Sequence, residues 1–296
     1  MPYPLFMETT KKKPRHSEVQ IESGWILSDS NRQKYNDYEY PRISIVIPTY
    51  NCAQSLRITI GSLLCQDYPD FEIVIVDGGS TDYTLEILKG YRDDRIHIFS
   101  FTGYQRYEMI NKGISHASGL YINILFPGDF YIYRGCLKNL MTVALNEDKP
   151  NLVYCGALLR DSKSDIKTLY RKLDVQLLRR GQQPTSLQSC WFRSDTFSII
   201  GKFDSGYALR GGFDLLCRYT LTPNLRTASL NRMLTDYDLR WVTRWMVVQH
   251  FWETMKTIYK YFGLLTVIQW FFTQKITSRF FLLWMRRIKV AFLGRG

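Results

Sequence analysis

The sequence predicts an α/β fold built around a mostly parallel sheet. Short runs rich in β-branched residues recur along the first half of the chain, segments with helical spacing of apolar residues separate them, and each run ends in a polar turn. Strands that alternate with helices form right-handed β-α-β units, in which the strands run parallel. Ligands of such sheets bind beyond the carboxyl ends of the strands.

The first strand–helix pair begins at residue 42. Residues 42–48 carry Arg-Ile-Ser-Ile-Val-Ile-Pro, a pattern typical of a buried strand that ends at a proline. Residues 53–66 have apolar residues at helical spacing, which predicts the helix that follows. Ordered structure is therefore expected to begin near residue 42, after a polar and charged tail.

Further strands and helices continue the same alternation. The apolar pattern predicts three more strands and two more helices, the strands at 71–76, 95–99 and 120–126 and the helices at 81–91 and 107–118. Polar turns follow the strands at 48–51, 77–82 and 127–129. In a parallel sheet these three turns should meet at one crevice.

Length and composition bound the domain organisation. The chain has 296 residues, of which 45% are hydrophobic and 22% charged, enough for one large or two modest domains. We expect a tail at 1–41, one domain at 42–240 and a separate helical segment at 241–296. Six cysteines lie far apart without C-x-x-C spacing, which predicts reduced thiols in a reducing compartment rather than a zinc site.

Neither a secretory signal nor a membrane-spanning helix is expected. The basic residues at 11–15 are not followed by an apolar core. The longest apolar stretch, 261–272, is too short to span a bilayer and contains Gln269. These patterns predict a cytoplasmic protein.

Two of the predicted strand ends carry chemically useful side chains. In the turn at 77–82, glycines permit a sharp bend, Ser80 or Thr81 can cap the next helix, and the carboxylate of Asp77 can accept hydrogen bonds from a base or ribose. Asp129 could bind Mg²⁺ if substrate phosphates and waters complete the coordination. A capped turn and an ordinary surface turn are the respective alternatives.

Three segments taken together carry a family resemblance. They are 45–51, Ile-Val-Ile-Pro-Thr-Tyr-Asn; 74–82, Val-Ile-Val-Asp-Gly-Gly-Ser-Thr-Asp; and Asn111-Lys112-Gly113-Ile114 before the strand that leads to Gly128-Asp129. Their order and spacing resemble glycosyltransferase family 2, whose fold is called GT-A. The resemblance covers roughly residues 42–240 and is most specific in its first half.

This resemblance implies a nucleotide-sugar donor, Mg²⁺ or Mn²⁺ as a divalent metal, and inversion at the anomeric carbon. It implies that Asp129 holds the metal and the diphosphate, that Asp77 binds the base, and that Ser80 and Asp82 support the loop around Asp77. The donor site as a whole would then comprise Pro48, Tyr50, Asn51, Asp77, Gly79, Ser80, Asn111 and Lys112.

The metal motif departs from the family pattern, because Phe130 follows Asp129 and a single acid remains where many members have two. Another pair of acids, in Asp236-Tyr237-Asp238, looks like a metal motif but lies after residues 188–204, which resemble the family's segment beneath the acceptor. A solvated loop is expected there. The four histidines are scattered, which speaks against a histidine metal site.

The position of the family's catalytic base also departs. The family's string Asp-aromatic-Asp-Leu-Leu-x-Arg corresponds to residues 212–218 here, so the base position is Gly212. Asp214 or Asp204 could be the catalytic base instead, the acceptor could be activated otherwise, or transfer could have been lost. Pairing of Asp214 with Arg218 at i+4 is the structural alternative.

Most of the positive charge lies near the C-terminus. The net charge is +12, from 39 Lys and Arg against 27 Asp and Glu, and residues 240–296 hold ten basic residues against one acid, Glu253. They also hold five of the seven tryptophans. An apolar helix face from Ile276 to Ala291, opposite Lys275 and Arg279, favours an interfacial helix on an anionic membrane. A helical lid or an oligomer interface is the alternative, and nucleic acid is not expected.

The sequence thus predicts a metal-dependent, inverting glycosyltransferase, peripheral on the inner face of a membrane. It would use a nucleotide sugar, expected to be UDP-linked, and a saccharide or lipid-linked acceptor, as in polysaccharide biosynthesis. The alternative is a GT-A-fold protein that has lost transfer and acts as a membrane-associated binding or scaffolding module. A nucleotidyltransferase is disfavoured, because Thr49-Tyr50-Asn51 stands where its Gly-rich loop would be.

Overall fold

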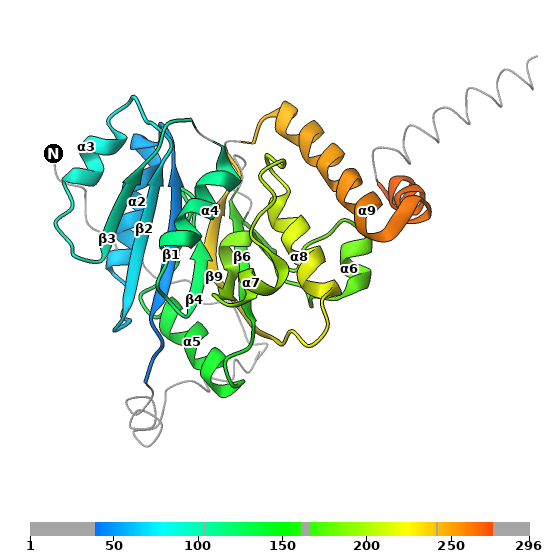
Figure 1. Ribbon diagram of the computed structural model, residues 1–296, viewed down its shortest axis with the longest axis horizontal. Helices are drawn as coiled ribbons and strands as arrows, with labels where there is room; N and C mark the ends of the chain where they lie inside the picture. The colour runs from blue at the N-terminus through cyan, green and yellow to red at the C-terminus, as the bar shows by residue number, and fades with distance from the viewer. Residues whose placement is uncertain (1–38, 104, 161–165, 241, 275–296) are drawn as a thin grey trace, which may run out of the picture. The chain divides into compact units, whose positions relative to one another are not determined.

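The computed structural model describes residues 39–103, 105–160, 166–240 and 242–274 (Figure 1). Those from Tyr40 onward belong to one unit organised around a single sheet. Nearly all of the expected tail at 1–41, and the expected helix face from Ile276 to Ala291, lie outside the described residues.

The first half of the sheet confirms the predicted alternation of parallel strands and helices. Strand order is β3-β2-β1-β4, with each neighbouring pair parallel. The elements are β1 (Ile43–Thr49), α2 (Ala53–Leu64), β2 (Phe71–Asp77), α3 (Thr84–Lys89), β3 (Ile96–Ser100), α4 (Arg106–His116) and β4 (Tyr121–Ile124). The helix predicted at 81–91 is shorter and begins only at Thr84. The Asp82 carboxylate accepts the backbone N–H groups of Ala53 and Thr84, and these bonds keep residues 81–83 in a turn before the helix.

The second half of the sheet is mixed, and its strands were not predicted from the sequence. Its order continues from β4 as β8-β6-β9-β5, with β7 beside β6, and only the β6–β9 pair is parallel. The elements are β5 (Phe130–Tyr131), α5 (Cys136–Asn146), β6 (Leu152–Arg160), β7 (Ile166–Leu169), α6 (Val175–Arg179), η1 (Leu187–Ser189), β8 (Cys190–Arg193), α7 (Thr196–Ile200), α8 (Gly211–Leu221) and β9 (Thr227–Asp238).

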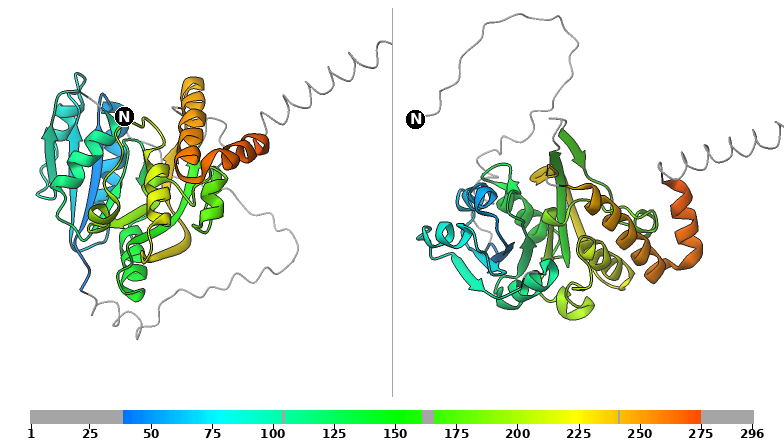
Figure 2. Two further views of the ribbon diagram at one scale, coloured as in Figure 1. Left: turned by 45° about the vertical axis from the view of Figure 1, so that its right-hand side comes forward. Right: turned by 90° about the horizontal axis from the view of Figure 1, so that it is seen from above.

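Helices cover both faces of the sheet (Figure 2). Along β1, Ile45 and Ile47 pack with α2 and α5, whereas Val46 packs with α4 and α8. This alternation follows from the two-residue period of a strand, and it explains why β1 is apolar on both faces. Helix α4 lies close to β1 at Gly113, where an added Cβ would stand 2.3 Å from a methyl carbon of Val46.

Helix α9 (Arg244–Thr273) follows the sheet and packs against α6 and α8. It turns at Gly263, whose φ of +77° lies in the region that favours glycine, so its last third departs in a new direction (Figure 1). Glu253 fixes α9 to the segment before α8, because its carboxylate accepts the backbone N–H groups of Ala208, Leu209 and Arg210. Among the described helices, none is long and apolar enough to cross a membrane.

Candidate active site

Two polar turns, which follow β1 and β2, are joined by hydrogen bonds. The backbone N–H of Asn51 donates to Ser80 Oγ at 2.9 Å, and Asn51 Oδ1 accepts from the N–H of Thr81 at 2.8 Å. Asn51 has a φ of +45°, which turns its side chain toward the second turn. Asp82 connects the same turns from the other side through the N–H of Ala53. The predicted convergence of these two strand ends is confirmed.

Asp77 lies beneath this turn and is fully buried. Its carboxylate accepts four hydrogen bonds, from the hydroxyls of Thr49 and Ser80 and from the backbone N–H groups of Gly79 and Ser80. Four bonds match the capacity of a carboxylate. In this structure Asp77 therefore shapes the loop, with Gly79 at a φ of +87°. A direct contact of Asp77 with a base stays a prediction.

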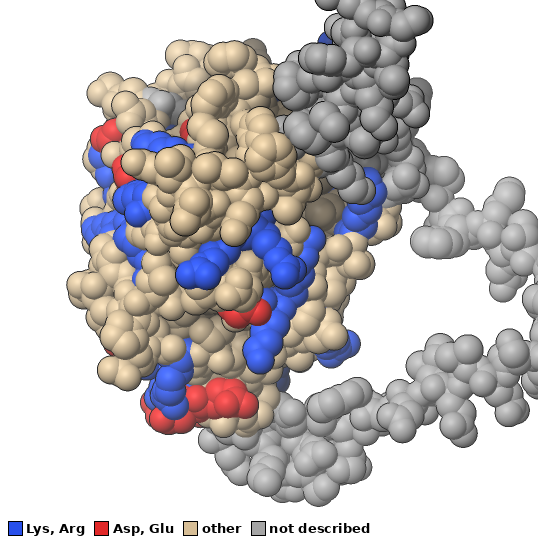
Figure 3. All heavy atoms as spheres, turned by 90° about the vertical axis from the view of Figure 1, so that its right-hand side faces the viewer, with Lys and Arg blue, Asp and Glu red and all other residues tan. Residues whose placement is uncertain are grey.

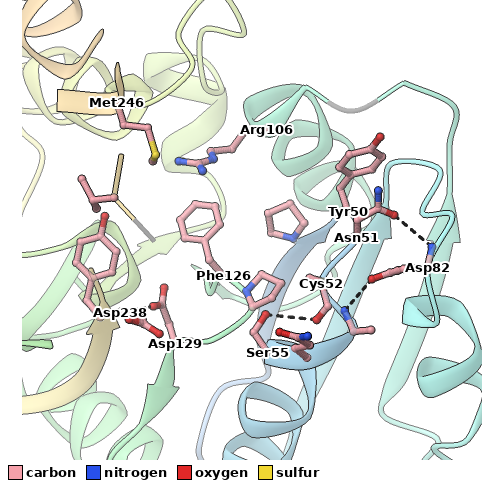
Figure 4. A pocket seen from close by; sticks show the side chains of 16 residues that line it. Tyr50, Asn51, Cys52, Ser55, Asp82, Arg106, Phe126, Asp129, Asp238 and Met246 are labelled. Carbon is pink, nitrogen blue, oxygen red and sulfur yellow. Dashed lines mark hydrogen bonds between the residues drawn. The ribbon is translucent and has the colours of Figure 1, made fainter. Parts of the chain in front are cut away.

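A pocket of about 490 Å³ opens at the carboxyl ends of β1 and β4 (Figure 4). Its wall includes three of the predicted donor residues, Pro48, Tyr50 and Asn51, together with Asp129. The remaining lining residues are Cys52, Ala53, Gln54, Ser55, Asp82, Arg106, Phe126, Pro127, Tyr237, Asp238, Val242 and Met246. The pocket therefore joins the predicted nucleoside side chains to the predicted metal-binding carboxylate.

Asp129 forms the acidic end of this pocket. It is only 3% exposed, and its carboxylate accepts from Gln188 Nε2 at 2.6 Å and from the backbone N–H of Asp238 at 3.0 Å. Burial raises the pKa of Asp129 to about 7, and the charges of Asp236 and Asp238 act in the same direction. A cation beside this carboxylate would favour its ionised form.

The prediction of a solvated loop at Asp236-Tyr237-Asp238 is wrong, because these residues form the end of strand β9. Parallel pairing of β9 with β6, with a register irregularity at 155–157, brings Tyr237 and Asp238 to the pocket wall beside Asp129. The Asp238 side chain is only 4% exposed. The resemblance of residues 236–238 to a metal motif was the one sequence signal for a role in the site. The contact with Asp129 was not predicted, because the two segments lie far apart in the sequence.

Arginines already bind the carboxylates of β9. Arg160 lies 2.7 Å from Asp236 and 3.8 Å from Asp238, and Arg240 contacts Asp238 at 2.8 Å. The hydrogen bonds from Arg240 lower the pKa of Asp238. Behind this end of the pocket, Asp236, Arg160 and Arg240 therefore form a charged cluster with Asp238. Among the described residues, no group of three His, Cys, Asp or Glu could hold a metal ion.

Asn111 and Lys112 of α4 do not line the pocket. Asn111 donates to the carbonyl of Phe203 at 2.7 Å and accepts the N–H of the same residue at 3.0 Å. Lys112 lies 3.3 Å from Glu108 and over the ring of Phe101. These contacts hold neighbouring segments against α4, so a role near the donor stays a prediction for both residues.

Asp214 and Asp204 do not line the pocket either. Asp214 is fully buried in α8, where its carboxylate accepts from Arg218 Nε at 3.0 Å, Lys260 Nζ at 3.0 Å and the hydroxyl of Tyr261 at 2.8 Å. Asp204 accepts the N–H of Gly206 and lies 3.8 Å from Lys260. The alternative pairing of Asp214 with Arg218 is confirmed, and the contacts of Asp214 favour a structural role.

Comparison with known protein families gives a family match. A family model described as "Glycosyl transferase family 2" matches residues 44–204. A PGL/p-HBAD biosynthesis glycosyltransferase of Mycobacterium tuberculosis is 28% identical over 201 residues, which are 67% of this chain and 77% of that protein. An uncharacterized glycosyltransferase of Rickettsia typhi is 30% identical over 194 residues, covering 63% of this chain and 60% of that one.

Solved structures share the fold. Staphylococcus aureus TarS, in complex with UDP-GlcNAc, superposes with a TM-score of 0.61 at 18% identity, over 73% of this chain and 65% of that one. A mannosyltransferase from Pyrobaculum calidifontis, in complex with GDP-Man and Mn²⁺, superposes with a TM-score of 0.54 at 17% identity, over 87% and 86% of the two chains. The mixed α/β sheet described above is thus of the GT-A type.

Proposed function

The chain belongs to glycosyltransferase family 2 and is a glycosyltransferase, and from this premise we propose that it transfers a sugar from a UDP-linked donor, with inversion, to a saccharide or lipid-linked acceptor. The observation that carries the proposal is the pocket itself. It places Pro48, Tyr50 and Asn51 in one wall and Asp129 in another, at the strand ends where α/β sheets bind ligands. The family relationship favours this enzyme over a scaffold that has lost transfer.

In the proposed reaction the bond between the anomeric carbon and the diphosphate oxygen breaks, and its electron pair leaves with the nucleoside diphosphate. The acceptor oxygen attacks the opposite face of that carbon and loses its proton to a base. Pro48, Tyr50 and Asn51 would line the nucleoside, and the hydrogen-bonded turns at 49–53 and 77–84 would hold them in place. Assignment of the base to Asp214 or Asp204 remains a prediction.

A divalent metal fits the acidic end of this pocket. Asp129 and Asp238 both line it, and Mg²⁺ or Mn²⁺ can use one or two carboxylates when phosphates and waters supply the other ligands. The placement of buried Asp129 beside Asp238 in one wall of the pocket is the observation that supports this fit, because a cation would offset the repulsion between the two carboxylates. When bound, the metal would neutralise the charge that develops on the leaving diphosphate.

Turnover of nucleotide sugars tests the proposed function. Purified full-length protein with Mg²⁺ or Mn²⁺ is expected to release UDP or GDP from at least one member of a panel of UDP- and GDP-linked sugars. The release should rise when a saccharide or lipid-linked acceptor is added. A panel in which every donor is neither bound nor hydrolysed would overturn the proposal.

The proposal places the protein peripherally on the inner face of a membrane. Trp245, Val248, Trp252 and Tyr259 are exposed on α9 at helical spacing, on the side away from its buried residue Thr254. On the face that carries α6 and α9, Lys and Arg side chains gather with few acids among them (Figure 3). Exposed aromatic residues beside cations suit the interface of an anionic bilayer, which supports a lipid-linked acceptor.

Vesicle binding tests this placement. Wild-type protein is expected to co-sediment with vesicles that contain phosphatidylglycerol, and the double variant Trp245→Ser/Trp252→Ser to bind about tenfold more weakly, because it loses apolar area at the interface. Trp245 and Trp252 are 73% and 58% exposed, so the fold should tolerate both changes. Tyr83→Ser, which changes an aromatic residue 77% exposed next to α3 rather than on α9, is the matched control. Unchanged binding of the double variant would contradict an α9-mediated contact.

A further inference from the structure

Arg106, the first residue of α4, supplies the only cationic side chain among the described residues that line the pocket. Figure 4 shows its guanidinium extending from α4 into the pocket, above Phe126 and toward Met246. The guanidinium carbon lies 5.1 Å from the centroid of the Phe126 ring. That ring holds the arginine in place without neutralising its charge.

The charge of Arg106 is uncompensated in the described part of the chain. The two arginines beside the acids of β9 are paired, Arg160 with Asp236 and Arg240 with Asp238, and buried Arg210 donates to Gln183 Oε1 and to the carbonyl of Gly181. No carboxylate lies within 4 Å of Arg106 among the residues that the structure describes. A half-buried guanidinium that contacts no carboxylate of the described residues, and that faces a ligand pocket, indicates an anionic ligand.

The position of Arg106 indicates which part of the ligand it meets. In the view of Figure 4, Arg106 and Phe126 stand between the side chains of Tyr50 and Asn51 and the carboxylates of Asp129 and Asp238. A nucleotide sugar that extends from the first set to the second would pass this point with its diphosphate. Ionised Asp129, whose hydrogen-bond partners Gln188 and the Asp238 N–H are neutral, would repel the phosphates unless a cation compensated, and the planar fork of a guanidinium matches phosphate oxygens.

We propose that Arg106 binds the diphosphate of the donor directly and stabilises it as a leaving group. This inference rests on the proposed function and assigns this chain's own cation to that site. It explains how a chain whose metal motif has a single acid can still hold a diphosphate. It also predicts that the phosphates, rather than the nucleoside or the sugar, carry the interaction.

The test compares ligands with and without phosphates. Calorimetric titration of full-length protein with uridine, UDP and UDP-glucuronic acid, with Mg²⁺ in every arm, is made for wild type, Arg106→Gln and Arg57→Gln. Arg57 is exposed on α2, lies outside the pocket lining and controls for the loss of one positive charge. Arg106→Gln should weaken UDP about 10- to 100-fold, the effect of a lost charged hydrogen bond, and leave uridine unchanged. Arg106→Lys should keep part of the affinity.

Each outcome separates the inference from the function. If wild type binds neither UDP nor UDP-glucuronic acid, the proposed function fails and the inference falls with it. If wild type binds UDP and Arg106→Gln binds it equally well, the inference alone is overturned. An equal loss of affinity for uridine would show that Arg106 acts on the nucleoside or on the fold. A loss of affinity confined to UDP-glucuronic acid would show that Arg106 binds the carboxylate of the sugar. Both results contradict the proposal. Unchanged melting temperatures show that the variants fold.

Discussion

Replacement of Asp214 by Asn is expected to lower the free energy of unfolding by about 2–4 kcal/mol. Removal of one partner from a fully buried ion pair costs about 3–5 kcal/mol. The cost should be somewhat smaller here because Lys260 and Arg218 keep 43% and 20% of their side-chain exposure. Asp214 is fully buried, and it is the carboxylate that joins α8 to α9 through these two cations and Tyr261. Urea denaturation followed by circular dichroism measures the change.

The same variant decides between a structural role and a catalytic role for Asp214. If the role is structural, the folded fraction of Asp214→Asn should turn over its donor at close to the wild-type rate. Asp195→Asn is the matched control, since the Asp195 side chain is 54% exposed, lies outside the pocket lining, and its loss should change stability little. An Asp214→Asn variant with unchanged stability and abolished transfer would contradict the structural account and identify Asp214 as the base.

Replacement of Asp129 by Asn is expected to reduce kcat/KM by about 100- to 1000-fold, the range for removing one group that stabilises developing charge. The variant keeps the size of the side chain and removes the one carboxylate that lies both in the pocket and at the predicted metal motif. Loss of a buried charge next to Asp236 and Asp238 should leave the fold intact. The amount of Mg²⁺ or Mn²⁺ needed for half-maximal turnover should rise as well.

Asp195→Asn is the control for the Asp129 variant. It makes the same chemical change in an exposed residue paired with Arg193, outside the pocket lining. Wild-type turnover in Asp129→Asn, at every metal concentration, would contradict a role for Asp129 in the reaction. The melting temperature of each variant shows whether it is folded, and it therefore separates a loss of turnover in folded protein from a loss caused by unfolding.

The first half of the fold could be predicted because its signals are local. Residues 43–49 and 71–77 are apolar on both faces, as strands covered by helices on both sides must be, and each ends in a turn whose residues permit it. Parallel strands place their carboxyl ends at one edge of the sheet. Pro48, Tyr50, Asn51 and Asp129 could therefore be assigned to one pocket before their positions were known.

The second half of the site depends on contacts between residues far apart in the chain. Asp238 lies beside Asp129 because β9 pairs with β6 on one side, in parallel, and with β5 on the other. No local sequence pattern specifies those two partners. Arg106 is the first residue of α4, where nothing in the local sequence marks it as a ligand-binding residue. It faces the pocket because its guanidinium lies over the ring of Phe126, which is distant in the sequence. For Asp214 the i+4 spacing to Arg218 was visible, whereas the contribution of Lys260 from α9 was not.

Release of a nucleoside diphosphate from a nucleotide sugar, measured for wild type and Asp129→Asn side by side, tests the central claim most directly. The claim is that the pocket between Tyr50 and Asp129 cleaves such donors. The account predicts metal-supported release by wild type with at least one UDP- or GDP-linked sugar, and a loss of about 100-fold or more in the variant. Release by neither protein, or equal release by both, would contradict it.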